Sequence, residues 1–502
     1  MKKFICYVLV AILFAGMLPA TAFAAMGRSY TYSYNEWGAP IPSPDVYFVS
    51  AYILGQHLYF NGENIGAFLS PQDIHVHGNL LYLADSGNHR IIIIEFFEDT
   101  TFEVIDIITS VNHNGAQTTF RNPHGIFVSP WYANYGQIWI ADTENHRILH
   151  MDENWNVLNE ILHPGIYGIS QLAPDSDFFP TKLAVDFSGR LFVQARAVNR
   201  GFMEFDRYGG FAGYMGAPPV EITPWDQIWR FIATQEQRER RLLNVPVEYN
   251  NLSIDDEGFI FGTISQVTDE LQPVVRLNMM GDDVLIRNGW AYPVGDLWYG
   301  QGGDRSGPSM FVAVTALPNG NYVVFDRNRG RLFAYDTQGN LLFVWGGPGP
   351  REGFFTMPAA LDNMGFTLFA LDAGIGANNA ALTRFDLTDY GALINKALEM
   401  YHRGLYEESY HLWHDVLRIN GNFGMAYIGI ARALLRQGYY RDAMELFRYQ
   451  NDNINFGRAF GFYRRIWMED HFWIFVVVVA TLAIVPPTVK KIIKVRREIR
   501  ES

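Results

Sequence analysis

The chain has 502 residues, of which 49% are hydrophobic and 15% aromatic, and its formal net charge is −13. A chain of this length and composition can bury a sizeable core without disulfide bonds, and its single cysteine, Cys6, has no second cysteine with which to form one. The acidic balance argues against a nucleic-acid partner, because surfaces that bind nucleic acid are basic.

The first residues have the pattern of a secretory signal peptide. Met1-Lys2-Lys3 precedes an apolar run from Phe4 to Leu18, and Ala22-Phe23-Ala24 supplies a small-residue cleavage site. We therefore expect residues 1–24 to be removed and the mature chain to leave the cytosol. Cys6 lies inside this segment and not at the cleavage site, so we expect no lipid anchor on it.

Two near-copies of one unit follow, from Ser70 to Ile91 and from Asn122 to Ile148. Each contains an opening proline, a strand of period two, an Asp-x-x-Asn-x-Arg turn and a second apolar strand. One such unit cannot bury both of its faces. Units of this kind bury one another when they are arranged around an axis as the four-stranded blades of a β-propeller.

Four further segments repeat the pattern less clearly. They begin at Pro180, Asn251, Val312 and Pro358. The expected fold class is therefore mainly β, with a six-bladed propeller over residues 25–389. The alternations Tyr30 to Tyr34 and Tyr47 to Ile53 precede the first clear blade, and we expect both to supply outer strands that close the ring with the last blade.

Residues 224–243 interrupt the blades with a helical pattern that has Pro224 at a plausible first helical position. This insertion could form a lid over the central channel. The alternative, which we favour, is that it fills space beside a degenerate blade.

After Asp386 the apolar period changes from two to about 3.6. Gly404, Tyr406 and Trp413 are matched thirty-four residues later by Gly438, Tyr440 and Phe447, which is the tetratricopeptide period. We predict two tetratricopeptide-like repeats over residues 390–455, with Ser409 and Ala443 where the helices cross. Their first helices offer a candidate peptide groove, although the same residues could instead pack against the propeller. The candidate groove residues are Ile394, Leu398, Tyr401, Ile428, Arg432 and Leu435.

A juxtamembrane linker over 456–471 leads to an uncharged segment, 472–489, which is long enough to span a bilayer as a helix. Residues 490–502 form a basic tail. The excess of Lys and Arg after the span predicts a cytoplasmic C-terminus and a large extracellular N-terminal part. A buried core helix broken by Pro486-Pro487 is the alternative, but such a helix would have no reason to end in a basic tail.

The turns Asp85-Ser-Gly-Asn-His-Arg-Ile and Asp142-Thr-Glu-Asn-His-Arg-Ile resemble those of NHL-repeat propellers. Together with the signal peptide, the helical repeats and the span, they are similar to a group of uncharacterised surface proteins of Gram-positive bacteria. The resemblance implies a propeller at the bacterial cell membrane and, as a second possibility, an accessory role beside carbohydrate ABC transporters. Some NHL propellers with lyase activity hold an axial metal through histidines.

The conspicuous polar residues of the repeat are expected to be structural. The Asp side chain can accept hydrogen bonds from backbone amides of the turn, Asn tolerates the left-handed conformation of a tight turn, and Arg can donate hydrogen bonds to the Asp. We expect no metal or other cofactor, because the residues after the aligned opening prolines include one ligand type only. Those residues are Gln72, His124, Thr181 and Ala359. No nucleophile motif was found, so no catalytic residue is predicted.

Binding is therefore the predicted activity. Three residues near the opening prolines are candidates for ligand contacts at the channel mouth, namely Asp73, His124 and Lys182. The first hypothesis is a non-enzymatic, membrane-anchored extracellular scaffold that recruits a membrane or secreted protein, for example a transporter. The alternatives are a carbohydrate-binding accessory to an ABC sugar transporter, and a metal-dependent hydrolase or lyase at the propeller centre.

Overall fold

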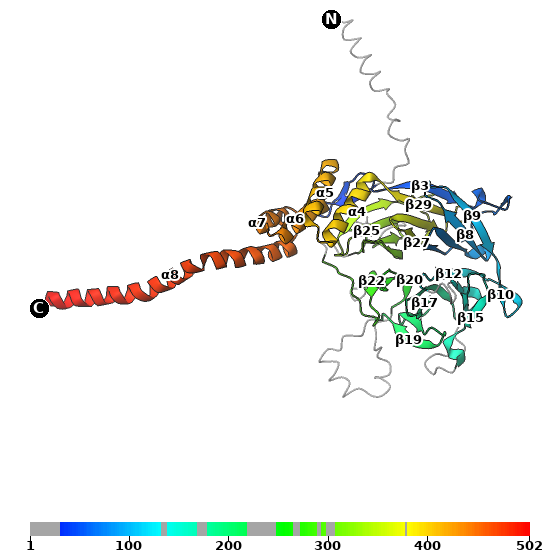
Figure 1. Ribbon diagram of the computed structural model, residues 1–502, viewed down its shortest axis with the longest axis horizontal. Coiled ribbons are helices and arrows are strands. Elements are labelled where there is room, and N and C mark those ends of the chain that lie inside the picture. The colour runs from blue at the N-terminus through cyan, green and yellow to red at the C-terminus, as the bar shows by residue number, and fades with distance from the viewer. Residues whose placement is uncertain are drawn as a thin grey trace, which may run out of the picture. The chain divides into compact units, whose positions relative to one another are not determined.

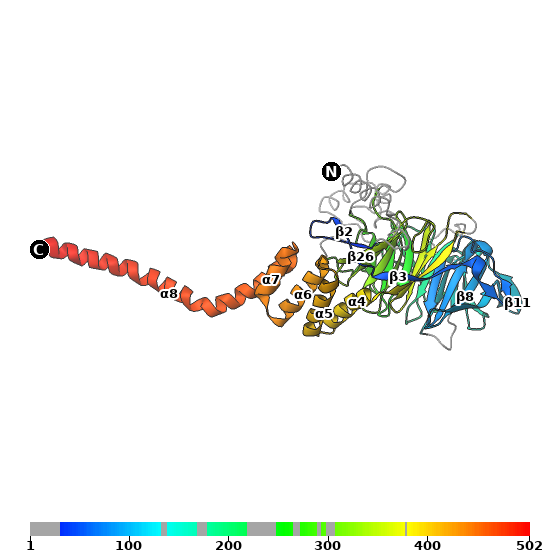
Figure 2. The same ribbon diagram turned by 90° about the horizontal axis from the view of Figure 1, so that it is seen from above.

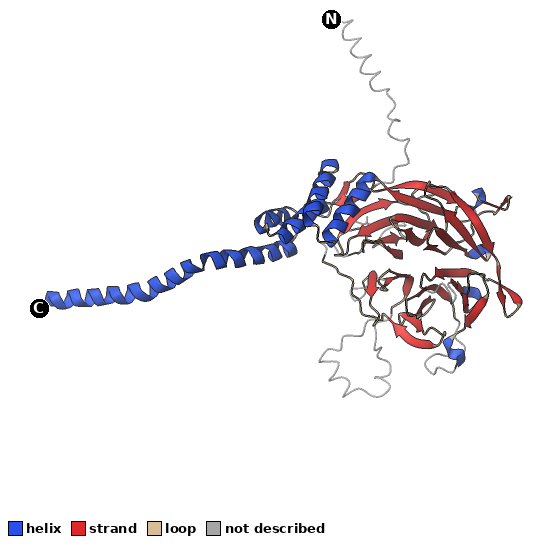
Figure 3. Cartoon of the chain, viewed as in Figure 1, coloured by secondary structure: helices blue, strands red, loops and turns tan. Residues whose placement is uncertain are grey.

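The structure is a computed structural model that describes residues 31–131, 138–167, 178–217, 247–264, 272–288, 293–297, 307–376 and 379–501. The predicted signal peptide (1–24) and helical insertion (224–243) lie outside these residues. The described chain forms two compact units, one made of residues 31–34 and 38–392 and the other of 35–37 and 393–501. Figure 3 shows that strands make up the first unit and that the chain is helical after it.

The first unit is a six-bladed β-propeller, as predicted (Figure 1). Blades one to three each have four antiparallel strands, with the following bounds: β6 (Asp73–His77), β7 (Leu80–Asp85), β8 (Arg90–Phe96) and β9 (Phe102–Ile108); β12 (Pro123–Val128), β13 (Ile138–Asp142), β14 (Arg147–Met151) and β15 (Val157–Ile161); β16 (Pro180–Val185), β17 (Leu191–Ala195), β18 (Phe202–Phe205) and β19 (Phe211–Met215).

Blade four has three strands among the described residues, and blades five and six have four each. Their bounds are β20 (Tyr249–Ile254), β21 (Ile260–Ile264) and β22 (Val274–Leu277); β23 (Phe311–Ala316), β24 (Tyr322–Asp326), β25 (Arg331–Tyr335) and β26 (Leu341–Gly346); β27 (Pro358–Met364), β28 (Thr367–Asp372), β29 (Ala381–Leu387) and β3 (Tyr47–Leu54). Two short hairpins, β4 (Tyr59–Phe60) with β5 (Glu63–Asn64) and β10 (Ser110–His113) with β11 (Ala116–Thr119), form separate sheets.

The first strand of every blade lies on the inside of the ring. These strands contact one another in the cyclic order β6, β12, β16, β20, β23, β27 and back to β6, so the ring is closed. Apolar side chains fill the space between neighbouring blades. Leu83 of blade one packs in one cluster with Phe369 of blade six, and Ala84 packs with Val128 of blade two in another. All four are almost fully buried, which places the core between the blades and leaves the axis to polar groups.

Two N-terminal strands were expected to close the ring with the last blade, and one of them does so. Strand β3 pairs with β29 over its whole length, from Tyr47 beside Leu387 to Leu54 beside Ala381. An N-terminal strand therefore completes the last blade, and Figure 1 shows the two strands side by side. This pairing joins the two ends of the propeller through backbone hydrogen bonds and removes an open edge.

The earlier strand, β1 (Tyr32–Tyr34), was predicted wrongly, because it joins blade five and not blade six. Tyr32 pairs with Val344 of β26, and β2 (Pro40–Pro42) pairs with β1. The Tyr32 and Tyr34 hydroxyl groups both donate to Oδ1 of the buried Asp296, and the Tyr34 bond measures 2.9 Å. The two tyrosines thus satisfy a buried carboxylate at blade five, which a blade-six position would leave without these donors.

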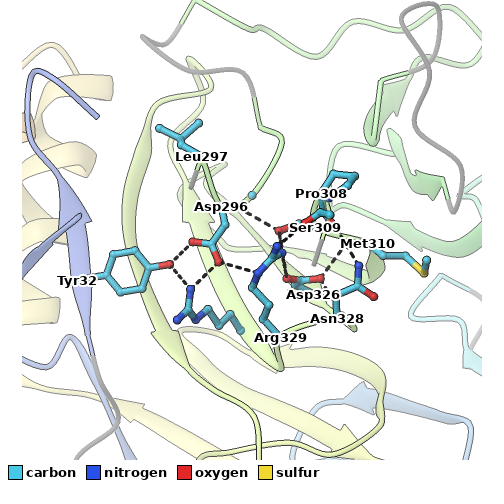
Figure 4. A network of polar contacts seen from close by, with 12 residues as sticks. Tyr32, Asp296, Leu297, Pro308, Ser309, Met310, Asp326, Asn328 and Arg329 are labelled. Atoms are coloured by element: carbon cyan, nitrogen blue, oxygen red, sulfur yellow. Dashed lines mark hydrogen bonds and ion pairs between the residues drawn. The ribbon is translucent and has the colours of Figure 1, made fainter. Parts of the chain in front are cut away.

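Two arginines complete this network, which Figure 4 shows from close by. Arg331 Nη1 lies 2.5 Å from Oδ2 of Asp296, and Arg329 Nε lies 3.5 Å from the same oxygen. Arg329 also approaches Asp326 at 3.4 Å, and Ser309 donates to Asp326 at 3.0 Å. Buried carboxylates and guanidinium groups are therefore paired here, which is the condition under which burying charge is tolerated.

The repeated turn is structural, as predicted. Asp85 Oδ2 accepts hydrogen bonds from Asn88 Nδ2 and Arg90 Nε, both at 2.8 Å, and Oδ1 accepts one from the Leu69 amide at 2.8 Å. The role of the asparagine was predicted wrongly. The left-handed residue is the histidine, with φ of 56° at His89 and 57° at His146, while the asparagine holds the aspartate.

The residue after the aspartate joins neighbouring blades. Ser86 Oγ donates to the carbonyl of Pro123 at 2.6 Å, and Thr143 Oγ1 donates to the carbonyl of Pro180 at 2.6 Å. The turn of one blade thereby holds the opening proline of the next. The motif therefore fixes the step from blade one to blade two and from blade two to blade three.

The second unit is helical, with α4 (Asp389–His402) beginning in the propeller unit and α5 (Tyr406–Ile419), α6 (Gly424–Gln437) and α7 (Tyr440–Tyr449) following. Figure 2 shows these helices in sequence order. Ser409 Oγ donates to the carbonyl of Ala397 at 2.9 Å, and Ser409 and Ala443 are fully buried. A Cβ atom on Gly429 would lie 2.3 Å from Nε1 of Trp413, so α5 and α6 need glycine where they cross.

The last helix, α8 (Asn453–Glu501), has 49 residues and runs through Pro486 and Pro487. It is the one helix of the described chain that is long and apolar enough to cross a membrane, and the apolar window that defines it is 0% buried. The predicted linker and span, and the basic tail as far as Glu501, lie on this continuous helix. Its first turns pack on α7, where Ala459 joins a small core with Phe447.

Candidate functional site

The channel candidates Asp73 and Lys182 meet across the ring. Asp73 begins β6 of blade one, Lys182 lies on β16 of blade three, and the Lys182 ammonium group forms an ion pair with Asp73 Oδ1. Lys182 Nζ also donates to the carbonyl of Gln72 at 3.2 Å, and Asp73 Oδ2 accepts from the Ile126 amide at 3.2 Å. Burial raises the pKa of Asp73, although the Lys182 charge opposes this shift.

This ion pair bridges two blades that are not neighbours, since β12 of blade two lies between them. The strands can approach because β12 has Gly125, where a Cβ atom would lie 2.5 Å from the carbonyl oxygen of Thr181. Both charged side chains are close to fully buried, at about a tenth of their free exposure. The pair therefore holds the starts of the inner strands together and leaves neither charge available to a ligand.

The third candidate, His124, lies beside the pair on β12. Its Nε2 atom is 2.9 Å from Nη2 of Arg196, at the end of blade three's second strand. Burial, together with the positive charges of Arg196 and Lys182, lowers the pKa of His124 to about 3. The structure thus brings the three predicted residues into one polar cluster at the starts of the inner strands.

Further along the axis, His75 and Asp362 form a second contact between blades. The His75 Nδ1 atom lies 3.4 Å from Asp362 Oδ2, and its Nε2 atom lies 3.1 Å from the carbonyl oxygen of Val128. The same carboxylate oxygen accepts a hydrogen bond from the Val76 amide at 2.7 Å. Burial lowers the pKa of His75, but the Asp362 carboxylate and the Val128 carbonyl outweigh burial and raise it overall.

A cavity of about 340 Å³ opens beyond this contact, where the inner strands end. The inner strands β6, β12, β20, β23 and β27 and the turns that follow them contribute side chains to it, as does β22 through Arg276. The polar or aromatic lining includes His75, His77, Phe127, Trp131, Ser253, Asp255, Asp256, Glu257, Arg276, Thr315, Asp362 and Asn363. This volume is at the lower end of the range of small-molecule sites.

The cavity lies at the opposite end of the inner strands from the three predicted residues. None of the three predicted channel residues lines this cavity, which is formed instead by residues such as His75, Asp255 and Asp362. A period-two strand does signal that His75 and His77 point the same way. The sequence gives no sign that Asp362, 287 residues away, faces His75.

Arg276 and its partners define one wall of the cavity. Its Nη2 atom lies 2.6 Å from Asp255 Oδ2 and 2.8 Å from Glu257 Oε2. The guanidinium carbon lies 4.0 Å from the centre of the Phe259 ring. Arg276 is thus held by two carboxylates and an aromatic face, which fixes its position and engages its charge.

The predicted tetratricopeptide groove was wrong for at least half of its residues. Ile394, Leu398 and Ile428 are buried, with exposed fractions of 0%, 5% and 9%. Ile428 and Leu435 belong to the helical core, where Phe447 and Ala459 also pack. Tyr401 and Arg432 are half-buried. The apolar spacing that suggested a groove therefore marks buried positions of the helices, and for Ile428 and Leu435 the packing of helices on one another.

A metal centre is not formed by the described part of the chain, in which no three His, Cys, Asp or Glu side chains are grouped so as to hold an ion. His75 and Asp362 come together, but their cavity neighbours do not complete a ligand set with them. Nothing in the described geometry therefore places a catalytic metal at the axis.

Comparison with known proteins finds similarity to solved structures alone, at low sequence identity. No protein-family model matches the chain, and no curated protein matches it. Virginiamycin B lyase of Staphylococcus aureus is 10% identical, with a TM-score of 0.40 over 68% of this chain and 100% of that chain.

Two other solved structures are similar to the same degree. The PQQ-bound aldose sugar dehydrogenase of Streptomyces coelicolor is 11% identical, with a TM-score of 0.39 over 68% of this chain and 98% of that one. The allergen Mala s 1 of Malassezia sympodialis is 11% identical, with a TM-score of 0.37 over 63% and 93%. At such identities neither a substrate nor an activity can be transferred to this chain.

Proposed function

We propose that the protein is a membrane-anchored extracellular scaffold that mediates protein–protein interaction. The observation that carries the proposal is α8, whose apolar window is 0% buried although an exposed apolar surface of this size is unfavourable in water. A span over 472–489 gives this surface a lipid environment. The signal-peptide pattern over 1–24 and the basic residues after the span favour an extracellular propeller and a cytoplasmic tail at a bacterial cell membrane.

In this proposal the propeller over residues 25–389 is of the NHL type, and the helices over 390–455 form two tetratricopeptide-like repeats. The partner protein binds to side chains that are exposed on the surface of the propeller and of the helices. Phe187 and Tyr208 in loops of the propeller are more than half exposed. In the second unit, so are Trp37 and Tyr439, which lies between α6 and α7. Exposed aromatic side chains are the residue type most enriched at protein interfaces. The partner is a membrane or secreted protein, of which a transporter is one example.

The test is a cross-linked pull-down of the full chain from membranes. The matched control carries residues 1–24 and 456–502 alone, so that it shares the leader, the span and the tail but lacks the propeller and the helical pair. The proposal expects at least one protein to be recovered with the full chain and not with the control. Identical recoveries from the two would contradict it.

A second function is favoured by the lining of the axial cavity, namely binding of an extracellular carbohydrate in support of uptake. Aromatic rings beside carboxylate, amide and hydroxyl groups suit a polyol. The cavity provides one of each kind with Trp131, Asp362, Asn363 and Thr315. A glycan array probed with the detergent-solubilised full chain tests this function. If no glycan bound, or if substitutions in the cavity weakened the binding of none, carbohydrate binding at this cavity would be ruled out.

A further inference from the structure

The axial cavity has an excess of negative charge. Among its described lining residues are four carboxylates, Asp255, Asp256, Glu257 and Asp362, against one guanidinium group, that of Arg276. Two histidines also line it. Burial, together with the nearby His75, lowers the pKa of His77, which favours a neutral imidazole there at neutral pH. The balance of these groups is therefore anionic.

The single guanidinium group cannot neutralise the whole cavity. Arg276 is committed to Asp255 and Glu257 at 2.6 and 2.8 Å. Asp256, on the turn between them, is exposed and has no hydrogen-bond or ion-pair partner among the described residues. Two carboxylates, Asp256 at the rim and Asp362 toward the floor, thus remain without a permanent positive partner. Both carboxylates line the same cavity.

The apolar part of the lining also favours an organic cation. Trp131 lies at the rim with 45% of its surface exposed, and the Phe127 ring lies 4.6 Å from the His75 ring. Aromatic faces attract ammonium and guanidinium groups through their ring quadrupole. A volume of about 340 Å³ accommodates an alkyl chain with such a head group.

We propose that the axial cavity binds an organic cation, an alkylammonium or guanidinium group that lies between Asp256 and Asp362 with its apolar part against Trp131. The overall charge of −13 attracts such a ligand from a distance. A free amine and a lysine side chain of a partner polypeptide present the same group. The proposal is independent of the scaffold function, because a free amine binds without any protein partner.

The His75 contact makes the binding depend on pH. When His75 is protonated it compensates the Asp362 charge, and when it is neutral that charge is available to the ligand. The charged and titratable groups around His75 are Asp362 of β27, His77 and Asp73 of β6, and Lys182 of β16, which is paired with Asp73. Affinity for the cation therefore rises as the pH rises through the pKa of His75.

The test uses the full chain in detergent micelles and probes that differ in charge and hardly in shape. n-Butylamine is compared with n-butanol, and glucosamine with glucose, by ligand-observed NMR titration. Nα-acetyl-lysine amide and Nα-acetyl-norleucine amide form a third pair, which reports whether a side chain on a peptide backbone enters as well as a free amine.

Two substitutions and one control complete the design. Asp256→Asn is expected to weaken butylamine binding by about threefold, the scale of an exposed ion pair. Asp362→Asn is expected to weaken it by roughly tenfold, since hydrogen bonds to charged groups are stronger when half-buried. The control Glu98→Gln removes one negative charge from the exposed β8–β9 turn in the outer half of blade one and is expected to change affinity by less than about twofold.

Each outcome decides the matter. Binding of the charged member of each pair, its loss in the two cavity variants and a rise of affinity between pH 5.5 and 8 that His75→Gln removes would support the proposal. Equal binding of butanol and butylamine would overturn it, as would no detectable amine binding or unchanged affinity in both cavity variants. A failed pull-down with intact amine binding would count against the scaffold function alone.

Discussion

Removal of the Asp142 carboxylate should destabilise the propeller strongly, because this side chain is the centre of the best-formed turn. Asp142 is fully buried and accepts three hydrogen bonds of 2.8 Å, from the Arg121 amide, Asn145 Nδ2 and Arg147 Nε. In Asp142→Ala these donors lose their acceptor. Arg147 keeps Glu160, at 2.9 Å, as a second ionic partner.

The magnitude follows from the loss of one partner of a buried ion pair, which costs about 3–5 kcal/mol. We expect the lower end, about 3 kcal/mol, because Glu160 continues to compensate the Arg147 charge. For a domain of this size, roughly 2 °C of melting temperature corresponds to each kcal/mol. Asp142→Ala is therefore expected to melt about 6 °C below the unsubstituted protein.

Thermal unfolding of the full chain in detergent, followed by near-ultraviolet circular dichroism, measures this shift. Glu153→Ala is the matched control, since it removes an exposed carboxylate from the same blade and is expected to shift the melting temperature by less than about 1 °C. If Asp142→Ala melted as the control does, the reasoning would be refuted, and the repeated Asp-Asn-Arg turn would again be a candidate for ligand binding.

Two further predictions concern packing and pH. Gly429→Ala forces a Cβ atom to within 2.3 Å of Trp413 Nε1 and should lower the stability of the helical unit by about 1–3 kcal/mol. Gly421→Ala, whose Cβ atom would have its nearest neighbour at 3.7 Å, should leave stability nearly unchanged. Limited proteolysis of the helical unit in the full chain compares the two variants, and equal resistance would contradict the packing argument. The pKa of His124 is lowered to about 3 in the folded chain, whereas an unperturbed histidine in the unfolded chain has a pKa of about 6.5. As the pH falls from about 6.5 toward 3, His124 is therefore protonated in the unfolded chain and neutral in the folded one, and the folded state loses stability. His124→Gln should therefore lose less melting temperature than the unsubstituted protein between pH 7 and 5, and equal losses would contradict this linkage.

The architecture was predictable because its signals are local. The near-copies ending at Ile91 and Ile148 contain the whole turn that defines a blade, and the period-two pattern of Tyr47 to Ile53 was enough to place β3 in the last blade. Strand β1 could not be placed in this way. It has three residues, and its position depends on Asp296, more than 260 residues away.

The candidate site was predictable only in part. Proximity to an opening proline identified Asp73 and Lys182, and the structure brings them together, but as a buried ion pair and not as free ligand contacts. The cavity depends on His75 facing Asp362 across the ring, a contact between residues 287 positions apart that no local pattern records. The helical groove failed for a related reason, since an apolar stripe at helical spacing marks core and groove alike, and Ile394 is core.

The central claim, a propeller outside the membrane on a single span, is tested most directly by cysteine labelling in intact cells. In a Cys6→Ser background the chain has no cysteine, so one can be introduced at Glu98 in the β8–β9 turn or at Ser502 in the tail. A membrane-impermeant maleimide is then added before or after lysis. The account predicts labelling of Glu98→Cys in intact cells and of Ser502→Cys only after lysis; the reverse pattern, or protection of both until lysis, would contradict it.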